Sequence, residues 1–130
     1  MKRIIRTIRA FFISIQARIE LWLAVQKAEK AYRGELVRRK IDKFHNLYHR
    51  GNIRYYVMPD FDNKLIIMHK GEMHRLRVKD RMDSEVKVHD LKRECFYYTC
   101  HANNQERISP ETREYKRKKY IEYRIKTTLK

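Results

Sequence analysis

The sequence has few of the residues that interrupt regular structure or cross-link a chain. Its 130 residues include three Gly and two Pro, so helices and strands meet few breaks. The two cysteines, Cys95 and Cys100, are too few for a disulfide framework and suit a reducing compartment. These scarcities exclude a disulfide scaffold and a low-complexity chain.

Long hydrophobic runs are also lacking. The uncharged stretch from Ala10 to Ala17 follows several basic residues, as in a signal peptide, but Arg18 and Glu20 come directly after it. A segment of this length is far short of the roughly 20 apolar residues that a membrane-spanning helix needs. We therefore expect a soluble, intracellular protein.

Acidic residues are scarce relative to basic ones. The chain has 16 Asp and Glu against 32 Lys and Arg, which gives a net charge of +16 and a pI near 10.1. Residues 1–50 hold 13 basic and 4 acidic side chains, residues 51–109 hold 11 and 9, and residues 110–130 hold 8 and 3. Such a surplus repels itself, so the sequence predicts a negatively charged partner. It also divides the chain into a nearly neutral module, 51–109, between two basic ends.

Residues 1–50 predict one long, basic, amphipathic helix. Apolar side chains recur at three- and four-residue intervals, which is the spacing of a helical stripe and not of a strand. A helix of this length would extend roughly 70 Å, more than a small module can cover. We expect the module to cover the part from Val37 to Tyr48, because that part is next to it in sequence, and we expect the part from Ile4 to Val25 to bind a partner.

The predicted partner-binding residues are the large apolar side chains of the earlier part. They are Ile4, Ile8, Phe11, Phe12, Ile15, Ile19 and Trp22. A basic helix with such a stripe also fits an anionic membrane surface. We expect a protein partner instead, because Arg18, Glu20 and Glu29 interrupt the apolar stripe.

The remaining segments predict an α+β fold that is mostly helical. Alternating residues in 53–58 and apolar residues in 64–69 flank a turn at 59–63, which indicates a two-stranded β-hairpin. Two short helices are expected, at 72–79 and from Val86 or Val88 to Thr99. Ser109 and Pro110 form a good helix start, so a basic C-terminal helix should occupy 110–127.

Basic side chains at the two ends are candidates for phosphate contacts. They are Lys2, Arg3, Arg6, Arg9, Arg113, Lys116, Arg117, Lys118, Lys119 and Arg124. Such contacts neutralise nucleic acid without reading its sequence, so binding should weaken steeply with salt. A solvated basic face is the alternative. Tyr115, Tyr120 and Tyr123 could stack on bases, but tyrosines at this spacing more often cover a core edge.

No pattern in the sequence predicts catalysis, a cofactor or a metal site. His45 and His49 are four residues apart, as in helical metal sites, but no third ligand is near in sequence. The spacing of His89, Cys95, Cys100 and His101 matches no zinc finger or ribbon, and Cys95 falls on a predicted core face. The adjacent pairs Glu72 with His74 and His89 with Asp90 lack a nucleophile motif or a glycine-rich loop around them. A small nuclease is the least implausible enzyme.

Three parts of the sequence are considered together: Arg9–Phe12, the hairpin segments Tyr55–Asp60 and Lys64–Met68, and Arg93–Tyr98. Together they resemble small uncharacterised proteins of crAss-like bacteriophages that infect gut Bacteroides-type bacteria. The resemblance implies a phage-encoded, virion-borne protein in the head, portal or neck, found in the virion or in the bacterial cytoplasm during assembly. It assigns no catalytic or ligand residue.

The prediction is therefore a non-enzymatic structural or assembly protein. It should be present in multiple copies, pack on other structural proteins through its N-terminal helix, and neutralise nucleic acid or an acidic protein surface. A free, sequence-non-specific nucleic-acid-binding protein and a peripheral membrane-surface protein are the alternatives.

Overall fold

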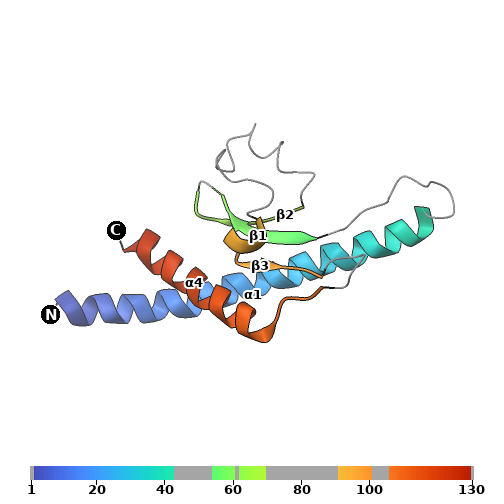
Figure 1. Cartoon of the computed structure of the whole chain (residues 1–130). Coiled ribbons are helices and arrows are strands. Elements are labelled where there is room, and N and C mark those ends of the chain that lie inside the picture. Colours follow the sequence, from blue (N-terminus) through green and yellow to red (C-terminus); the bar gives the residue numbers. More distant parts are fainter. Residues whose placement is uncertain (1, 43–53, 61, 70–90, 101–105, 130) are drawn as a thin grey trace.

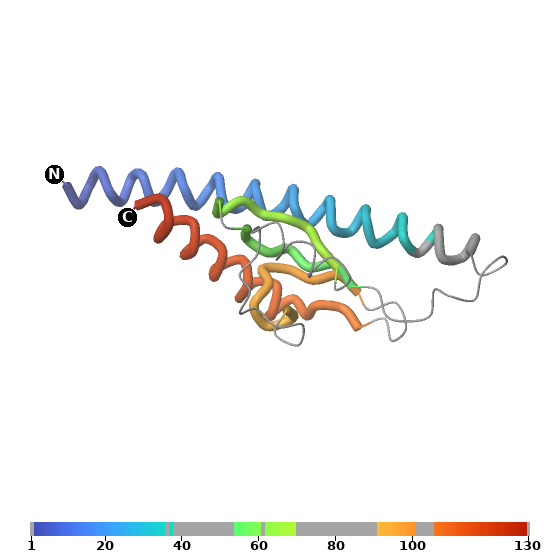
Figure 2. Tube along the Cα trace, turned by 90° about the horizontal axis from the view of Figure 1, so that it is seen from above, coloured from blue at the N-terminus to red at the C-terminus, as the bar shows by residue number. Residues whose placement is uncertain are grey.

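The protein is an α+β structure, mostly helical, built around one long helix (Figure 1). The computed structural model describes residues 2–42, 54–60, 62–69, 91–100 and 106–129. Three helices, α1 (Lys2–Asp42), α3 (Leu91–Glu94) and α4 (Pro110–Thr128), and a three-stranded antiparallel sheet account for most of this part of the chain. The start of α1 and the end of α4 lie at the same end of the molecule (Figure 2).

Helix α1 runs from Lys2 to Asp42, so it is about 60 Å long. The predicted long helix is confirmed over this range, and its last part, 43–50, lies outside the described residues. Both ends of α1 project beyond the elements that pack on its middle (Figures 1 and 2). The described sheet and α4 therefore cover only the middle of α1.

The sheet contains the predicted hairpin. Strand β1 (Tyr55–Pro59) pairs with β2 (Leu65–His69), with Val57 opposite Ile67. In the turn, the Asp60 Oδ1 atom accepts hydrogen bonds from the backbone N–H groups of Asp62 (2.8 Å) and Lys64 (3.0 Å). Asn63 adopts a left-handed φ of 63°, which asparagine tolerates better than most residues.

A third strand replaces the end of a predicted helix. Helix α3 covers only Leu91–Glu94, and β3 (Tyr97–Tyr98) follows and pairs with the other edge of β1. The prediction of a helix up to Thr99 was therefore wrong at its end. Aromatic and β-branched residues favour strands, and the Phe96 and Thr99 N–H groups donate to carbonyls of β1 at 2.9 and 3.0 Å. The predicted helix at 72–79 lies outside the described residues.

The sheet separates two apolar clusters. Val57 and Tyr97 face α1, while Met58, Met68 and Tyr98 face the opposite side. There they pack with residues on and just after α3, including fully buried Leu91 and Cys95. The helical spacing that we used to predict Cys95 in a core was therefore informative, although the chain between Leu91 and Tyr98 changes from helix to strand.

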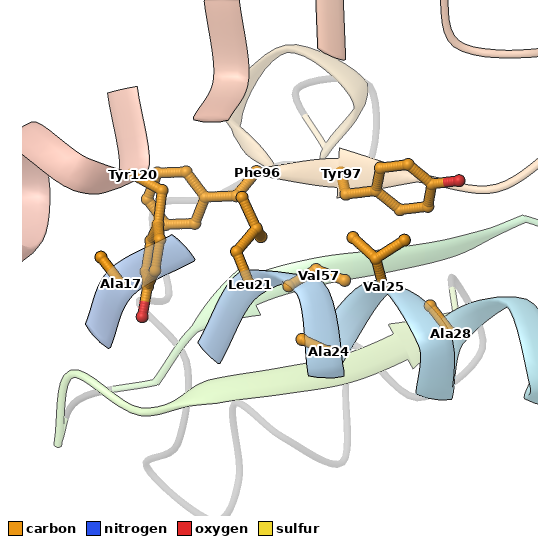
Figure 3. Packing of buried hydrophobic residues seen from close by; sticks show 9 residues of the cluster. All are labelled: Ala17, Leu21, Ala24, Val25, Ala28, Val57, Phe96, Tyr97 and Tyr120. Carbon is orange, nitrogen blue, oxygen red and sulfur yellow. The ribbon is translucent and has the colours of Figure 1, made fainter. Parts of the chain in front are cut away.

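Helix α4 (Pro110–Thr128) confirms the predicted C-terminal helix. Ser109 is its N-cap, since its hydroxyl oxygen accepts a hydrogen bond from the Thr112 backbone N–H at 3.2 Å. Helix α4 crosses α1, and fully buried Tyr120 packs its ring edge-on against Phe96, with the ring centres 4.9 Å apart. Figure 3 shows this cluster between α1, β1, β3 and α4.

The module packs on the middle of α1, not on the predicted Val37–Tyr48 part. Val37 is 58% exposed, and residues 43–50 lie outside the described part of the chain. Three alanines, Ala17, Ala24 and Ala28, allow the sheet and α4 to approach the helix axis closely. Their small side chains contribute little to a hydrophobic pattern, so sequence proximity misled the prediction.

Candidate partner-binding face and basic surface

Helix α1 carries two separate apolar faces. The covered face lies under the sheet and α4 and is buried. It consists of Ile13, Ala17, Leu21, Ala24, Val25, Ala28 and Tyr32. The outer face is exposed. It consists of Ile4, Ile5, Ile8, Phe11, Phe12, Ile15, Ile19, Trp22 and Leu23.

The two faces point in nearly opposite directions. Because successive helical residues are about 100° apart, the centres of the two sets lie roughly 160° apart around the axis. A partner on the outer face would therefore not compete with the fold of the chain itself. The division of α1 is between two sides of the helix, not between two halves of its length.

All seven predicted partner-binding residues lie on the outer face. Their exposed fractions run from 41% at Ile15 to 65% at Ile4. Ile5 and Leu23 belong to the same face and were missed because each sits one step from the main apolar rhythm. Contiguous exposed apolar patches beyond a few hundred Å² mark interaction sites in soluble proteins.

Charged residues do not interrupt the outer face as the sequence suggested. Glu20 turns toward α4, where the Arg124 Nε atom lies 2.9 Å from its Oε1. Glu29 accepts a hydrogen bond from the Tyr97 hydroxyl at 2.5 Å, on the covered side. Arg18 lies at the border between the faces. The argument that these residues interrupt the face, which favoured a protein partner over a membrane surface, therefore does not hold for Glu20 and Glu29.

The predicted phosphate-contacting residues of α1 are all exposed: Lys2, Arg3, Arg6 and Arg9. The Arg6 guanidinium donates to the Leu129 backbone carbonyl at 3.5 Å, directly after α4. The two basic ends of the sequence therefore meet in space. This places the N-terminal cations near the C-terminal end of α4, where Lys126 is exposed.

The cations of α4 are in different environments. Lys118 is exposed and Lys119 is half-buried. Arg117 pairs with Glu114 at 2.9 Å, Arg124 pairs with Glu20, and the Arg113 guanidinium lies 5.4 Å from the centre of the Tyr97 ring. Exposed ion pairs hold a side chain by only about 0–1 kcal/mol, so Arg117 stays available to another anion.

Lys116 is an exception, and its prediction as a phosphate contact was wrong. Its side chain is buried, and its ammonium donates to the backbone carbonyls of Cys95 (2.6 Å), Lys92 (2.9 Å) and Arg93 (3.2 Å). Burial lowers the pKa of Lys116, while the neighbouring Cys95 acts in the opposite direction. The Lys116 ammonium group therefore links α4 to the end of α3 and is not exposed to solvent.

The tyrosines of α4 are in two kinds of environment, and both were considered in the sequence analysis: packing at a core edge and exposure to a stacking partner. Tyr120 and Tyr123 pack with Phe96, while Tyr115 is 67% exposed. Burial, and after it the charge of Glu20, raises the pKa of Tyr120. Tyr115 is thus the tyrosine of this set whose ring is open to a stacking partner.

Two arginine-bearing helices enclose a small pocket that sequence analysis missed. It lies between α1 and α4, has a volume of about 200 Å³, and is lined mostly by apolar surface. Trp22, Arg18, Arg113 and Arg117 stand among its lining residues. We call it the arginine pocket. Its residues come together only because α4 crosses α1, and no local sequence pattern predicts that crossing.

The candidate metal and catalytic residues are only partly described. His45, His49, Glu72, His74, His89, Asp90 and His101 lie outside the described residues. Cys95 and Cys100 are buried and are not joined in a disulfide, and burial raises the pKa of Cys95. Among the described residues, no three His, Cys, Asp or Glu side chains are grouped as a metal site would require.

A search of the described helices finds none with the length and apolarity needed to cross a membrane. Comparison of the chain with protein-family models, with curated proteins and with solved structures finds no match.

Proposed function

We propose that this chain is a non-enzymatic structural or assembly protein that docks on a partner protein through the outer face of α1. The observation that carries the proposal is the presence of two opposed apolar faces on one helix, of which the fold covers one. In the setting that the sequence resemblance implies, the protein is a minor component of a phage head, portal or neck. It acts in several copies, in the virion or in the bacterial cytoplasm during assembly.

The energetics support a specific partner. Complete burial of a large apolar side chain contributes about 1.5–3 kcal/mol, so covering nine that are half exposed contributes on the order of 10 kcal/mol. Association costs an estimated 4–15 kcal/mol in lost translational and rotational freedom. The two quantities are comparable, so the outer face needs a well-fitting surface and favourable charges to bind tightly.

The basic surface supplies the second part of the proposal. The exposed cations at the start of α1 lie near the C-terminal end of α4, which carries exposed Lys126, and the net charge is +16. Such a surface binds the phosphate backbone or an acidic protein through charge alone. We therefore propose that this end neutralises nucleic acid or an acidic surface while the outer face holds the protein in place.

Site-specific photo-crosslinking in purified assemblies tests the docking surface. A benzophenone side chain at position 12, in place of Phe12, should crosslink repeatedly to the same region of one structural protein. The same group in place of exposed Tyr115 on α4 is the matched control and should not reach that region. Crosslinking of one region from both positions, or of no protein from position 12, would count against the proposal.

Retention of duplex DNA at increasing salt tests the basic surface. Binding should be detectable at low salt, fall steeply as salt rises, and show no dependence on DNA sequence. Replacing Arg3 and Arg9 by Gln should reduce the salt dependence, whereas Lys116 should not contribute. If the chain retains no DNA even at low salt, both this role and the alternative of a free nucleic-acid-binding protein fail.

A membrane surface is a second candidate for the outer face. The observation in its favour is that Glu20 and Glu29 turn away from this face, which leaves it apolar and opposite the module. A basic amphipathic helix with Trp and Phe on its apolar side lies in anionic bilayer interfaces. Flotation with liposomes of phosphatidylglycerol and phosphatidylcholine distinguishes the two: a protein-docking face predicts that the chain stays in the bottom fraction.

A further inference from the structure

The arginine pocket adjoins the outer face of α1. Trp22 belongs to both, since it lines the pocket and is 57% exposed on the outer face. Phe96 and Tyr97, which lie on the module side, are also among the lining residues, and both are buried. A partner that covers Trp22 would therefore also close the mouth of this pocket.

The pocket has an excess of positive charge. Three guanidinium groups line it, and among the described residues the ion pair that they form is the exposed one between Arg117 and Glu114. The Arg113 guanidinium lies over the Tyr97 ring, 5.4 Å from its centre. Guanidinium groups bind carboxylates in a planar, two-point geometry, so the pocket suits an acidic side chain beside an apolar contact.

A second copy of the chain is a poor occupant. Residues 2–23 contain five cations, Lys2, Arg3, Arg6, Arg9 and Arg18, and one acidic residue, Glu20, which already pairs with Arg124. If two copies pair through this segment, parallel or antiparallel, the cations of one copy lie beside the cations of the other, and each chain carries a net charge of +16. Like charges brought together at an interface oppose association.

We propose that the outer face and the arginine pocket form one docking surface for an amphipathic helix of a different protein, with carboxylates bordering its apolar side. The inference rests on the proposed function and specifies the partner. The outer face from Ile4 to Leu23 extends about 30 Å, which corresponds to five or six turns of a partner helix. Its apolar side covers the outer face, and its carboxylates pair with Arg18, Arg113 and Arg117.

Trp22 provides the measurement, because it is the only tryptophan of the chain. Two synthetic 20-residue helical peptides share one apolar face of Leu and Ala. One has Glu on both borders and the other has Lys at the same positions. Titration of the intact protein should shift Trp22 emission to shorter wavelength, with the Glu peptide binding at least about tenfold more tightly than the Lys peptide.

Charge reversal on the protein identifies the groups responsible. The double variant Arg18→Glu with Arg117→Glu should remove the preference for the Glu peptide. The variant Lys118→Glu with Lys126→Glu, at two exposed positions of α4 outside the pocket lining, changes the net charge equally and should keep that preference. Circular dichroism verifies that both variants fold. The comparison of the two peptides on the unmodified protein is independent of these variants.

The outcomes separate the inference from the proposed function. If both peptides bind equally, the docking face stands and the acidic partner is overturned. If neither peptide shifts Trp22, the docking face itself fails, and the proposed function with it. If sedimentation shows a dimer that Phe11→Glu abolishes, the occupant of the outer face is a second copy of the chain. If anionic vesicles bind more tightly than the Glu peptide, the occupant is a lipid surface. Either result overturns the inference.

Discussion

The two apolar faces of α1 differ in the size of their side chains. The covered face is built around Ala17, Ala24 and Ala28, whereas the outer face carries only large side chains, among them Phe11 and Trp22. Small residues let the sheet and α4 pack against the helix backbone. Large residues left in water provide area for another molecule. The comparison teaches that a strong apolar stripe need not be the side on which a chain folds.

Truncation on the two faces should give the largest difference in stability. Leu21→Ala on the covered face removes a side chain that is 6% exposed and should lower the free energy of unfolding by about 2–5 kcal/mol. Ile19→Ala, on the outer face, should change it by less than about 0.5 kcal/mol. Urea unfolding followed by circular dichroism measures both. Equal losses would mean that the chain itself covers the outer face.

A similar comparison applies to two lysines of α4. Lys116→Met leaves three backbone carbonyls without their donor and should cost about 1–3 kcal/mol. Lys118→Met, at an exposed position, should be neutral within about 0.5 kcal/mol. Thermal unfolding of the two variants checks this. A neutral Lys116→Met would show that the ammonium is not required where α4 meets α3.

High pH should distinguish buried from exposed tyrosines. Burial, and after it the hydrogen bond with Cys100, raises the pKa of Tyr32 to about 12, and burial also raises the pKa values of Tyr97 and Tyr120. A raised pKa in the folded state favours the neutral phenol. Stability from these groups is therefore complete below the unfolded value of about 10 and declines as pH rises above it.

Absorbance at 295 nm during an alkaline titration follows the phenols. We expect some tyrosines to ionise near their ordinary pKa and others only at higher pH, as the protein unfolds. Phe substitution of Tyr97 should remove one member of the late group. A single transition that includes all tyrosines near pH 10, with the fold intact, would contradict the burial of these rings.

The smallest effect on stability is expected from polar substitutions at the projecting end of α1. Ile4→Gln, Ile8→Gln and Phe11→Gln should each change the free energy of unfolding by no more than about 0.5 kcal/mol. Together they should clearly reduce the fluorescence of the hydrophobic dye anilinonaphthalene sulfonate added to the folded protein. Unchanged dye fluorescence would indicate that this end of the outer face is not accessible.

The sequence predicted the features that depend on local chemistry. The apolar rhythm of α1, the hairpin with its turn at Asp60 to Asn63, and the N-cap Ser109 each follow from neighbouring residues and are confirmed as structure. The exposure of Trp22 and its neighbours on α1 agrees with the predicted docking residues, whose binding role remains a prediction.

Features that depend on the meeting of distant segments could not be predicted. The burial of Lys116 requires α4 to reach the end of α3, and the arginine pocket requires α4 to cross α1 near Trp22. The covered face was missed because alanines such as Ala17 contribute little to a hydrophobic pattern. Strand β3 was missed because Leu91, Cys95 and Tyr98 have helical spacing but are brought together by a change from helix to strand.

The central claim is that the outer face of α1 is open in the isolated chain and covered in the assembly. Acrylamide quenching of the single tryptophan, Trp22, measures this directly, because its side chain is 57% exposed on that face. We predict efficient quenching in the purified chain and several-fold weaker quenching in the purified assembly. Equal quenching in both states, or a Trp22 already protected in the isolated monomer, would contradict the account.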